Sequence, residues 1–402
     1  MKKIAVAGLL AMMLLLAPAL ALADWPQAKH DAQHTSVGTA LTPPLTVDWQ
    51  KNIGGEVVSS PIIYNGTLFV ANGNGKKLLA LDPGSGGQLW EFPAYGSIES
   101  TPAAANSSVV VCSYDGFVYR LDISSGTIRW KFDAKSGMFS SPLVYEGLVY
   151  VGTDDGKFYA LSLENGTCLW SMPNATQSSP AGGDGKVYVG TIDGIFHALD
   201  AASGGEAWRY DAKDSFHSSP LFYNGTVYVA SRNGTLYAFD ASGGGVRWAH
   251  DMGYNVDATP SVDPATGTLY LGTYGGRVFA FNASDGGLEW ASAFYGPIYQ
   301  SVAVSGNVLY GATQDGKLFA LDRSGATLWT YGLPGSAFAS PAIDGGRLYM
   351  ATMGGDVITF KESPSATAPV PTASPAPVPT PFTGIIACAL IIITAGLCHR
   401  SR

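Results

Sequence analysis

Residues 140–170 read SSPLVYEGLVYVGTDDGKFYALSLENGTCLW, and this stretch decides the fold. Two short runs rich in β-branched and aromatic residues, 148–152 and 157–161, flank the turn signal Asp154-Asp155-Gly156. A second turn signal, Asn165-Gly166, precedes a further strand that contains the closing tryptophan. Short apolar runs joined by Gly-bearing turns predict antiparallel hairpins.

The phrase recurs along most of the chain with a period of about 40 residues. Its opening Ser/Thr-Pro marker returns eight times, with some variation, at 59–61, 100–102, 140–142, 178–180, 218–220, 258–260, 300–302 and 339–341. Seven tryptophans close the successive phrases, at Trp90, Trp130, Trp170, Trp208, Trp248, Trp290 and Trp329. Four short strands in each such period are typical of a propeller blade.

The eighth unit, residues 340–362, stops before its tryptophan strand. The segment 45–53 around Trp49 supplies a strand of the same kind at the front of the chain. If this segment completes the last blade, the ring closes and leaves no free sheet edge. The sequence therefore predicts an all-β fold, an eight-bladed β-propeller of four-stranded blades over residues 24–362.

The closing phrase of each unit has the form Ala-x-Asp-x-x-x-Gly-x-x-x-Trp, as at Ala80, Asp82, Gly86 and Trp90. It resembles the tryptophan-docking motif of PQQ-like (pyrroloquinoline quinone-type) propeller repeats. Single positions depart from the motif, at Arg120, Ser162 and Asn282. The resemblance implies that the eight tryptophans, Trp49 included, pack between blades and belong to the core.

The PQQ-like family includes quinoprotein dehydrogenases, a propeller lipoprotein of the outer-membrane assembly machine, and surface proteins without known activity. The dehydrogenases carry an adjacent Cys-Cys pair and long insertions, and both are missing from this sequence. PQQ is a polyanion, whereas this chain has a net charge of -8. We therefore expect no cofactor and no enzyme. A PQQ- and Ca²⁺-dependent dehydrogenase and an envelope-assembly factor remain the alternatives.

The acidic balance also excludes nucleic acid as a partner, because 23 basic residues face 31 acidic ones and form no cluster. We expect no metal site, since the six histidines lack ligand spacing and the Asp-Gly pairs fit tight turns better than Ca²⁺ loops. His197 is predicted to be a strand residue with a satisfied hydrogen bond. Cys112 and Cys168 are expected to be buried free thiols.

The two ends of the chain predict export and anchoring. Residues 1–23 have the charged start, apolar run and small-residue cleavage site of a signal peptide. Residues 363–381 form a Pro/Ser/Thr-rich stalk, and 382–402 an apolar segment with a basic end, which is either retained in the membrane or removed by a sorting enzyme. Both outcomes place a monomeric propeller at the cell surface, tethered to the membrane through its C-terminal tail.

One position, immediately before each Ser/Pro marker, differs in nearly every blade. If the first strand of each blade lines the axis, these residues converge on a funnel. They are Val58, Glu99, Phe139, Gln177, His217, Asp257, Tyr299 and Phe338. The acidic residues and the histidine could bind a cation or polar groups, and the aromatic residues could stack on a sugar or a side chain. The predicted partner is an extracellular protein or glycan, and an ordinary solvated pore mouth is the alternative.

Seven Asn-x-Ser/Thr sequons make glycosylation of an exported chain a further prediction. They begin at Asn65, Asn106, Asn165, Asn174, Asn224, Asn233 and Asn282. In four of them the asparagine is followed by glycine, a pair that also favours a hairpin turn.

Overall fold

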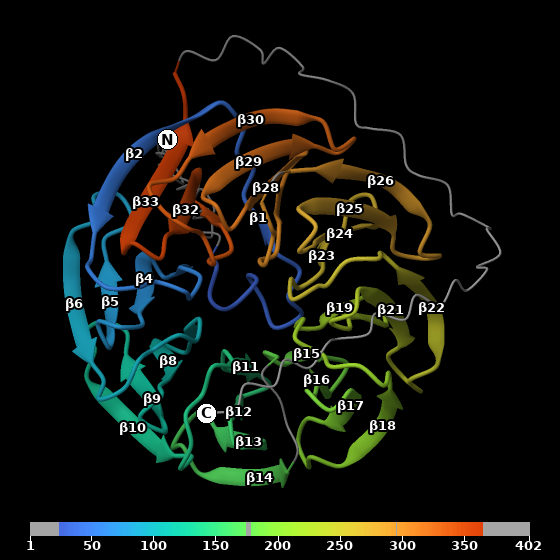
Figure 1. The fold of residues 1–402 in the computed structure, drawn as a ribbon. Coiled ribbons are helices and arrows are strands. Elements are labelled where there is room, and N and C mark those ends of the chain that lie inside the picture. The colour runs from blue at the N-terminus through green and yellow to red at the C-terminus, as the bar shows by residue number, and fades with distance from the viewer. Residues whose placement is uncertain (1–23, 174–177, 295, 365–402) are drawn as a thin grey trace, which may run out of the picture.

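The computed structural model describes residues 24–173, 178–294 and 296–364, and these residues form a ring of eight β-sheets around a central axis (Figure 1). Each sheet is a blade of four antiparallel strands, and no helix occurs in the described ranges. The structure confirms the predicted eight-bladed propeller. The predicted signal peptide, most of the stalk and the apolar tail lie outside the described residues.

In the first seven blades the strands run from the axis outwards in chain order, and in blade 8 the outermost strand comes from the N-terminal part of the described chain. The innermost are β3 (Ile62–Tyr64), β7 (Ala103–Ala105), β11 (Leu143–Tyr145), β15 (Ala181–Gly183), β19 (Leu221–Tyr223), β23 (Ser261–Asp263), β27 (Ala303–Ser305) and β31 (Ala342–Asp344). The second strands are β4 (Thr67–Asn72), β8 (Ser108–Cys112), β12 (Leu148–Gly152), β16 (Lys186–Gly190), β20 (Thr226–Ala230), β24 (Thr268–Gly272), β28 (Val308–Ala312) and β32 (Arg347–Ala351).

The third strands are β5 (Lys77–Leu81), β9 (Phe117–Asp122), β13 (Lys157–Ser162), β17 (Ile195–Asp200), β21 (Thr235–Asp240), β25 (Arg277–Asn282), β29 (Lys317–Asp322) and β33 (Asp356–Glu362). The outermost are β6 (Gln88–Pro93), β10 (Ile128–Asp133), β14 (Cys168–Pro173), β18 (Glu206–Asp211), β22 (Val246–Asp251), β26 (Leu288–Ala293), β30 (Thr327–Gly332) and β2 (Leu45–Asn52). A short extra strand, β1 (Val37–Gly38), pairs in parallel with β27.

The ring closes as predicted. β2 pairs antiparallel with β33 from Leu45 opposite Glu362 to Asn52 opposite Asp356, so the N-terminal strand is the outermost strand of blade 8. Asp48 on β2 fixes this pairing through Arg347, whose Nε lies 2.9 Å from its carboxylate, and through Lys361. Pairing with β2 covers the outer edge of β33, which would otherwise be a free edge.

The closing tryptophans join neighbouring blades. The indole N–H of seven of them donates to a backbone carbonyl at the turn of the next blade, at 2.8–3.1 Å: Trp49 to Pro83, Trp90 to Ile123, Trp130 to Leu163, Trp170 to Ala201, Trp208 to Ala241, Trp248 to Ala283 and Trp290 to Arg323. A buried indole is stable when its N–H finds such a partner. These side chains are structural, as the motif implied.

Trp329 is the exception, and the closure explains it. It faces blade 8, whose third and fourth strands come from opposite ends of the described chain and are joined by no turn. Among the described residues Trp329 makes no indole hydrogen bond and packs edge-to-face on Phe360, with ring centroids 6.0 Å apart.

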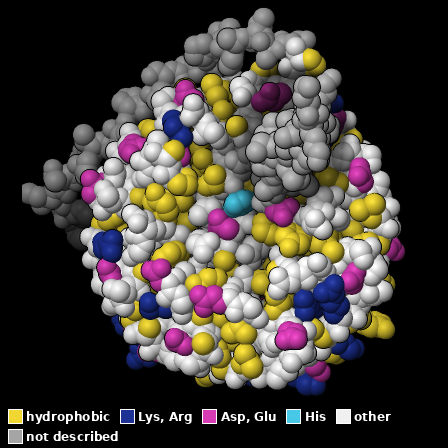
Figure 2. All heavy atoms as spheres, turned by 180° about the vertical axis from the view of Figure 1, so that it is seen from behind, with side chains coloured by type: hydrophobic (Ala, Val, Ile, Leu, Met, Phe, Trp, Pro, Cys, Tyr) yellow, Lys and Arg dark blue, Asp and Glu magenta, His cyan; other side chains and the backbone are white. Residues whose placement is uncertain are grey.

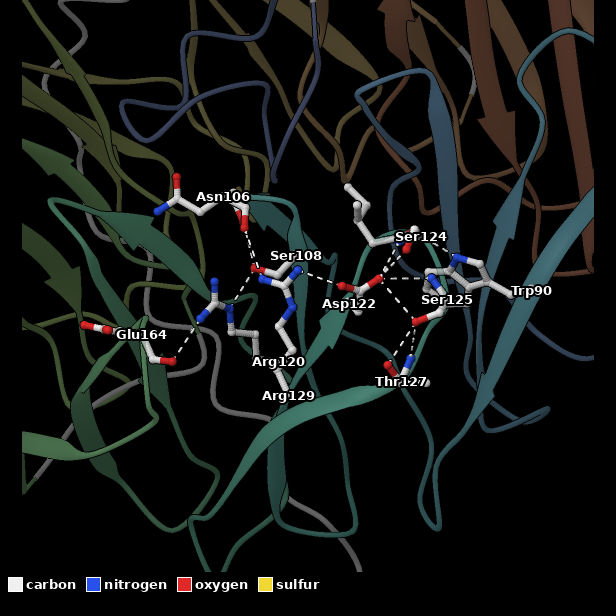
Figure 3. A network of polar contacts seen from close by, with 12 residues as sticks. Trp90, Asn106, Ser108, Arg120, Asp122, Ser124, Ser125, Thr127, Arg129 and Glu164 are labelled. Atoms are coloured by element: carbon white, nitrogen blue, oxygen red, sulfur yellow. Dashed lines mark hydrogen bonds and ion pairs between the residues drawn. The ribbon is translucent and has the colours of Figure 1, made fainter.

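Where the motif aspartate is present, it caps the turn that receives the tryptophan, as Figure 3 shows for blade 2. In blade 2, Asp122 accepts hydrogen bonds from the backbone and hydroxyl of Ser124 and pairs with Arg129 at 2.7 Å. These bonds hold the pKa of Asp122 well below its usual range. In blade 6, Asn282 Oδ1 accepts the same two hydrogen bonds from Ser284, so the asparagine amide caps this turn in place of the aspartate.

Arg120 replaces the small alanine of the motif and extends the contact between blades 2 and 3. Its Nε donates to Ser108 Oγ at 2.7 Å, and its Nη1 donates to the carbonyls of Leu163 and Glu164 in the next blade (Figure 3). The side chain is buried, with 7% of its surface exposed. The departure from the motif therefore adds an inter-blade clamp.

An N-terminal plug, residues 25–38, fills the channel at the centre of the ring, where Figure 1 shows it in dark blue. Seven blades donate the backbone N–H of the middle residue of their innermost strand to it. The bonds run in order from Ile63 to Trp25 O, Ala104 to Pro26 O, Val144 to Gln27 Oε1, Gly182 to Ala32 O, Phe222 to Gln33 O, Val262 to Thr35 O and Val304 to Ser36 O. The plug thus satisfies donors that the inner strand edges would otherwise leave unpaired.

The plug follows a tightly coiled path. Lys29, His30, His34 and Ser36 all have positive φ, between 58° and 85°, a conformation that residues other than glycine rarely adopt. His34 is 2% exposed, and its Nδ1 lies 2.8 Å from the carbonyl oxygen of Pro220. Burial lowers the pKa of His34 to about 4, so its ring is neutral and Nδ1–H donates this bond at neutral pH.

The two ends of the propeller differ in what they carry. The marker loops and the turns between second and third strands lie at one end, which we call the funnel end, and the remaining hairpin turns lie at the other, the base. The described chain enters at the base, where Asp24 accepts a hydrogen bond from Asn65 N. It also leaves there, because Lys361 pairs with Arg347 at the start of β32.

The two cysteines of the globule are free, as predicted, but only Cys112 is buried. Cys168 is exposed on the outermost strand β14, so the prediction that both thiols are buried is wrong for it. The outer strand faces solvent on one side, and its alternation places Cys168 there. Within the described ranges, no helix has the length and apolar character needed to cross a bilayer.

Candidate binding funnel

A cavity of about 380 Å³ opens at the funnel end, and all eight blades contribute to its lining. Seven of the eight positions singled out in the sequence meet there: Val58, Glu99, Phe139, His217, Asp257, Tyr299 and Phe338. Gln177, the eighth, lies outside the described residues. The positions converge because each precedes an innermost strand and these strands surround the axis. The volume lies in the lower part of the range of small-molecule pockets, roughly 300–1,000 Å³.

One wall of the cavity is a row of three aromatic rings. Tyr274 meets Tyr299 edge-to-face with centroids 4.5 Å apart, and Tyr299 stacks on Phe338 at 5.3 Å. All three side chains are half-buried, so part of each ring remains accessible. Tyr274 lies in the turn between β24 and β25, outside the marker position, and the sequence analysis did not single it out. The equivalent position in other blades varies, and the available signal was this variation: it is Tyr114, Asp154, Ile192, Arg232, Gln314 and Met353.

Polar groups adjoin this wall. The Tyr274 hydroxyl donates to Asp257 Oδ2, and Asp257 Oδ1 is a buried atom without a hydrogen-bond partner among the described residues. His217 Nε2 lies 3.4 Å from Arg232 Nη1. Burial lowers the pKa of His217, and nearby Asp257 opposes that shift. A half-buried acceptor beside aromatic rings is a suitable partner for a ligand hydroxyl.

The opposite wall is acidic. Burial raises the pKa of Glu99, and the neighbouring carboxylates Glu56 and Asp154 raise it further. The same two influences, burial and the carboxylates of Asp154 and Glu99, raise the pKa of Tyr114 to about 12. In the described ranges, no ion pair joins Glu99 or Asp154 to a basic side chain. The mouth of the funnel therefore repels anions of high charge.

Below the variable positions runs a ring of hydroxyl groups, one from each marker: Ser60, Thr101, Ser141, Ser179, Ser219, Thr259, Ser301 and Ser340. Around five successive junctions, from blade 8 to blade 5, the hydroxyl oxygen accepts the backbone N–H of the equivalent residue in the preceding blade, at 2.9–3.1 Å. The sequence analysis treated these residues as scaffold markers only. The structure shows that six of them also line the cavity: Ser60, Thr101, Ser141, Ser179, Ser219 and Thr259.

The plug forms the floor. It bonds to the innermost strands three residues beyond the hydroxyl ring, roughly 10 Å deeper along an extended strand. Lys29 extends from the plug to line the cavity. Burial lowers the pKa of its amine to about 8, and none of the ion pairs among the described residues includes it. The sequence analysis missed Lys29 because the plug belongs to no repeat.

The cavity does not fit PQQ with Ca²⁺. Across the residues that the structure describes, no group of three or more His, Cys, Asp or Glu side chains is placed to hold a metal ion. Cys112 and Cys168 lie on different blades, so they form no vicinal pair over the cavity. Among the described residues that line the cavity, Lys29 is the one lysine or arginine, and it lies there with His217 and the carboxylates Glu99 and Asp257. On the face seen in Figure 2, too, basic side chains are scattered among acidic and apolar ones without a broad basic patch.

Most of the sequons lie away from the funnel. Asn65, Asn106 and Asn224 are exposed in turns at the base, with φ of 48–49°. Asn165 also lies in a base turn, and Asn282 ends strand β25 at the base. Asn233 lies in a turn at the funnel end, and Asn174 falls outside the described residues. Modification at the base would leave the funnel open.

His197 is a strand residue with a hydrogen bond, as predicted. Its Nδ1 lies 2.9 Å from Glu206 Oε2 on the neighbouring strand β18. The Asp-Gly pairs occupy hairpin turns, with φ of 83–92° at Gly116, Gly156, Gly194 and Gly316. These positions need glycine for its left-handed backbone, which accounts for the pairs without a metal.

Comparison with known proteins gives one family. The model of the family described as outer membrane protein assembly factor BamB matches residues 74–181, 164–298 and 290–364, which together cover more than half of the chain. No curated protein sequence matches the chain.

Solved structures share the fold at low sequence identity. BamB from Moraxella catarrhalis has a TM-score of 0.68 and 20% identity, over 79% of this chain and 99% of that one. Quinohemoprotein alcohol dehydrogenase from Comamonas testosteroni has a TM-score of 0.74 and 16% identity, over 87% and 82%. The computationally designed protein Ika8 has a TM-score of 0.69 and 17% identity, over 81% and 99%. An assembly factor, an enzyme and a design share this architecture, so function must be argued from the site.

Proposed function

We propose, on the premise that the chain belongs to the repeat family described as outer membrane protein assembly factor BamB, that it is a non-catalytic surface protein whose funnel binds a glycan. The observation that carries the proposal is the aromatic wall of Tyr274, Tyr299 and Phe338 beside the acceptor Asp257 in one small cavity. Aromatic faces pack against the apolar faces of sugar rings, while carboxylates and amides bind their hydroxyls.

The polar lining supports a hydroxyl-rich ligand. Gln300 and Gln314 line the same cavity and offer both a donor and an acceptor. Asp257 Oδ1 has no hydrogen-bond partner within the described part of the chain, and a ligand hydroxyl would satisfy it. The cavity holds a group the size of one or two sugar rings, which suits the end of a glycan better than the flat face of a protein.

The placement of the chain ends supports a role at the surface. The described chain enters and leaves at the base, so a C-terminal tail anchored in the membrane would hold the base towards the membrane. The funnel would then open away from the cell, where a glycan can reach it.

A second candidate is docking of a partner protein at the funnel end, as the family's name suggests by analogy. Four apolar side chains in loops of this end, all outside the cavity lining, are exposed: Tyr95 at 86%, Ile192 at 57%, Tyr114 at 40% and Tyr254 at 37%. Exposed aromatic residues around a cavity are typical of protein contact surfaces. This surface lies outside the cavity, so the two candidates predict different sensitive residues.

The test is binding of the purified full-length protein to an array of glycans. We expect selective binding that falls at least tenfold in Tyr299→Ala and is abolished in the triple variant Glu99→Ala, His217→Ala, Asp257→Ala. Tyr95→Ala is the matched control, because it removes an exposed aromatic outside the cavity. Glycan binding that survives the triple variant would contradict the funnel site. Loss of a protein partner in Tyr95→Ala, without any glycan binding, would favour the second candidate.

A further inference from the structure

We infer that the funnel is selective for an acidic saccharide, whose single carboxylate lies on Lys29 within the hydroxyl ring while its sugar ring stacks on Tyr299 and Phe338. This inference rests on the proposed glycan binding and names the class of glycan.

Lys29 is the first reason. Five lysines of the described ranges pair with carboxylates, among them Lys77 with Glu91 at 3.0 Å and Lys157 with Asp155 at 2.9 Å. Lys29 has none in the described ranges, although it is half-buried at the floor of the cavity. Its backbone is fixed at φ 58°, and its carbonyl accepts a hydrogen bond from Ser36 N at 2.9 Å. An ammonium group that is partly buried and has no counter-ion, as at Lys29, is a suitable binding site for an anion.

The hydroxyl ring is the second reason. Ser60, Thr101, Ser141, Ser179 and Ser219 each use the oxygen to accept a backbone N–H. None of these five hydroxyls donates to an acceptor among the described residues, so their hydrogens remain for a ligand. Uncharged O–H donors and one ammonium that line the same cavity match the two oxygens of a carboxylate.

The charge of the walls limits the ligand to one negative charge. Glu99 and Asp257 line the same cavity as Lys29. A phosphate or a polycarboxylate would bring more charge past these carboxylates than one ammonium can offset. A monocarboxylate attached to a neutral, hydroxyl-rich ring meets both the cationic floor and the aromatic wall.

The protonation of Lys29 gives this site a pH dependence. Burial lowers the pKa of its amine to about 8, so the cation is present below that pH and is lost above it. The charged groups that face it are few: His34 behind it is neutral above pH 4, and Glu99, His217 and Asp257 lie in the cavity. A bound carboxylate stabilises the ammonium, so affinity falls once the free amine is neutral.

The experiment is calorimetric titration of the purified full-length protein with methyl β-D-glucuronide and with methyl β-D-glucoside, which differ only in the carboxylate. We expect the glucuronide to bind at least tenfold more tightly to the wild type. Lys29→Gln should remove that preference and Lys29→Arg should retain it. Lys213→Gln is the matched control, because Lys213 is an exposed lysine paired with Asp211.

A second measurement does not depend on the folding of a variant. With wild-type protein, affinity for the glucuronide should fall nearly tenfold for each pH unit above about 8, while affinity for the glucoside should stay constant. Equal affinities of the two sugars, or a glucuronide affinity that is constant from pH 7 to 9.5, would overturn the inference and leave glycan binding intact. If neither sugar nor any glycan binds, the proposed function itself fails. Binding of a peptide through its free C-terminus, but not of the glucuronide, would overturn the inference too.

Discussion

Single residues hold the blades together through close packing of glycine on tryptophan. Gly204 has φ of 72°, and a Cβ there would lie 2.6 Å from the indole of Trp170. The same relation recurs where Gly86 meets Trp49 and Gly126 meets Trp90. The motif glycine is therefore needed twice, once for its backbone conformation and once for the space it leaves.

The variant Gly204→Ala separates these two needs when it is compared with Gly225→Ala. Gly225 has nearly the same φ, 69°, but nothing lies within 4 Å of its missing Cβ. Both variants place alanine in a left-handed conformation, at a cost of about 1–2 kcal/mol. Only Gly204→Ala should add the overpacking cost of about 1–3 kcal/mol. Urea unfolding of both variants measures the difference, and equal stabilities would contradict the packing role.

His34 makes the protein sensitive to acid. The pKa of His34 is about 4 in the folded state and 6.5 in the unfolded state. Between these two pH values, the unfolded state binds a proton at His34 and the folded state does not. The free energy of unfolding should therefore fall by roughly 3 kcal/mol as the pH drops from 7 to 4. We expect His34→Gln to lose that part of the pH dependence in urea unfolding. Parallel pH profiles of wild type and variant would show that His34 is not the responsible group.

The residues that repeat could be predicted from the sequence, and the residues that do not repeat could not. The position before each marker follows from equivalence between blades, which located Glu99, His217 and Asp257 in the cavity. Lys29 stands in a segment without an equivalent anywhere in the chain. Its place in the channel depends on backbone hydrogen bonds from seven blades. Such bonds do not require a particular side chain, so the sequence does not reveal them.

At the scale of elements, the plug is the unexpected feature. The sequence predicted that the segment around Trp49 completes blade 8, and β2 does so. It gave no sign that the residues before β2 pass through the channel, because the segment has neither strand periodicity nor turn signals of the repeat. Its positive φ values at Lys29 and His34 belong to a path that the surrounding strands impose.

The plug should protect the innermost strands from hydrogen exchange. The amides of Ala104, Gly182 and Val304 donate to it at 2.6–2.8 Å, and without it they face the channel. A variant that lacks residues 24–36 should exchange these amides much faster than the wild type. Amides of β12, which are bonded within their own blade, are the internal control. Unchanged protection of the three amides in the shortened variant would show that the plug does not seal the inner edges.

At the scale of the whole molecule, closure and orientation matter most. Trp329 lacks the hydrogen bond of its seven counterparts because blade 8 is built from both ends of the described chain. The same closure brings Asp24 and Lys361 to the base and leaves the funnel at the far end. The number of blades and the closing strand followed from counting repeats. The floor of the funnel needed the three-dimensional path of the plug.

We propose that this funnel binds a saccharide and does not hold a quinone cofactor. Structures of quinoprotein dehydrogenases share its fold, so the most direct measurement is calorimetric titration of the full-length protein with PQQ in the presence of Ca²⁺, with a dye-linked alcohol oxidation assay on the same sample. The acidic walls and the single lysine of the cavity predict no saturable heat and no dye reduction. Saturable PQQ binding with dye reduction would contradict the account and make the protein a small quinoprotein dehydrogenase.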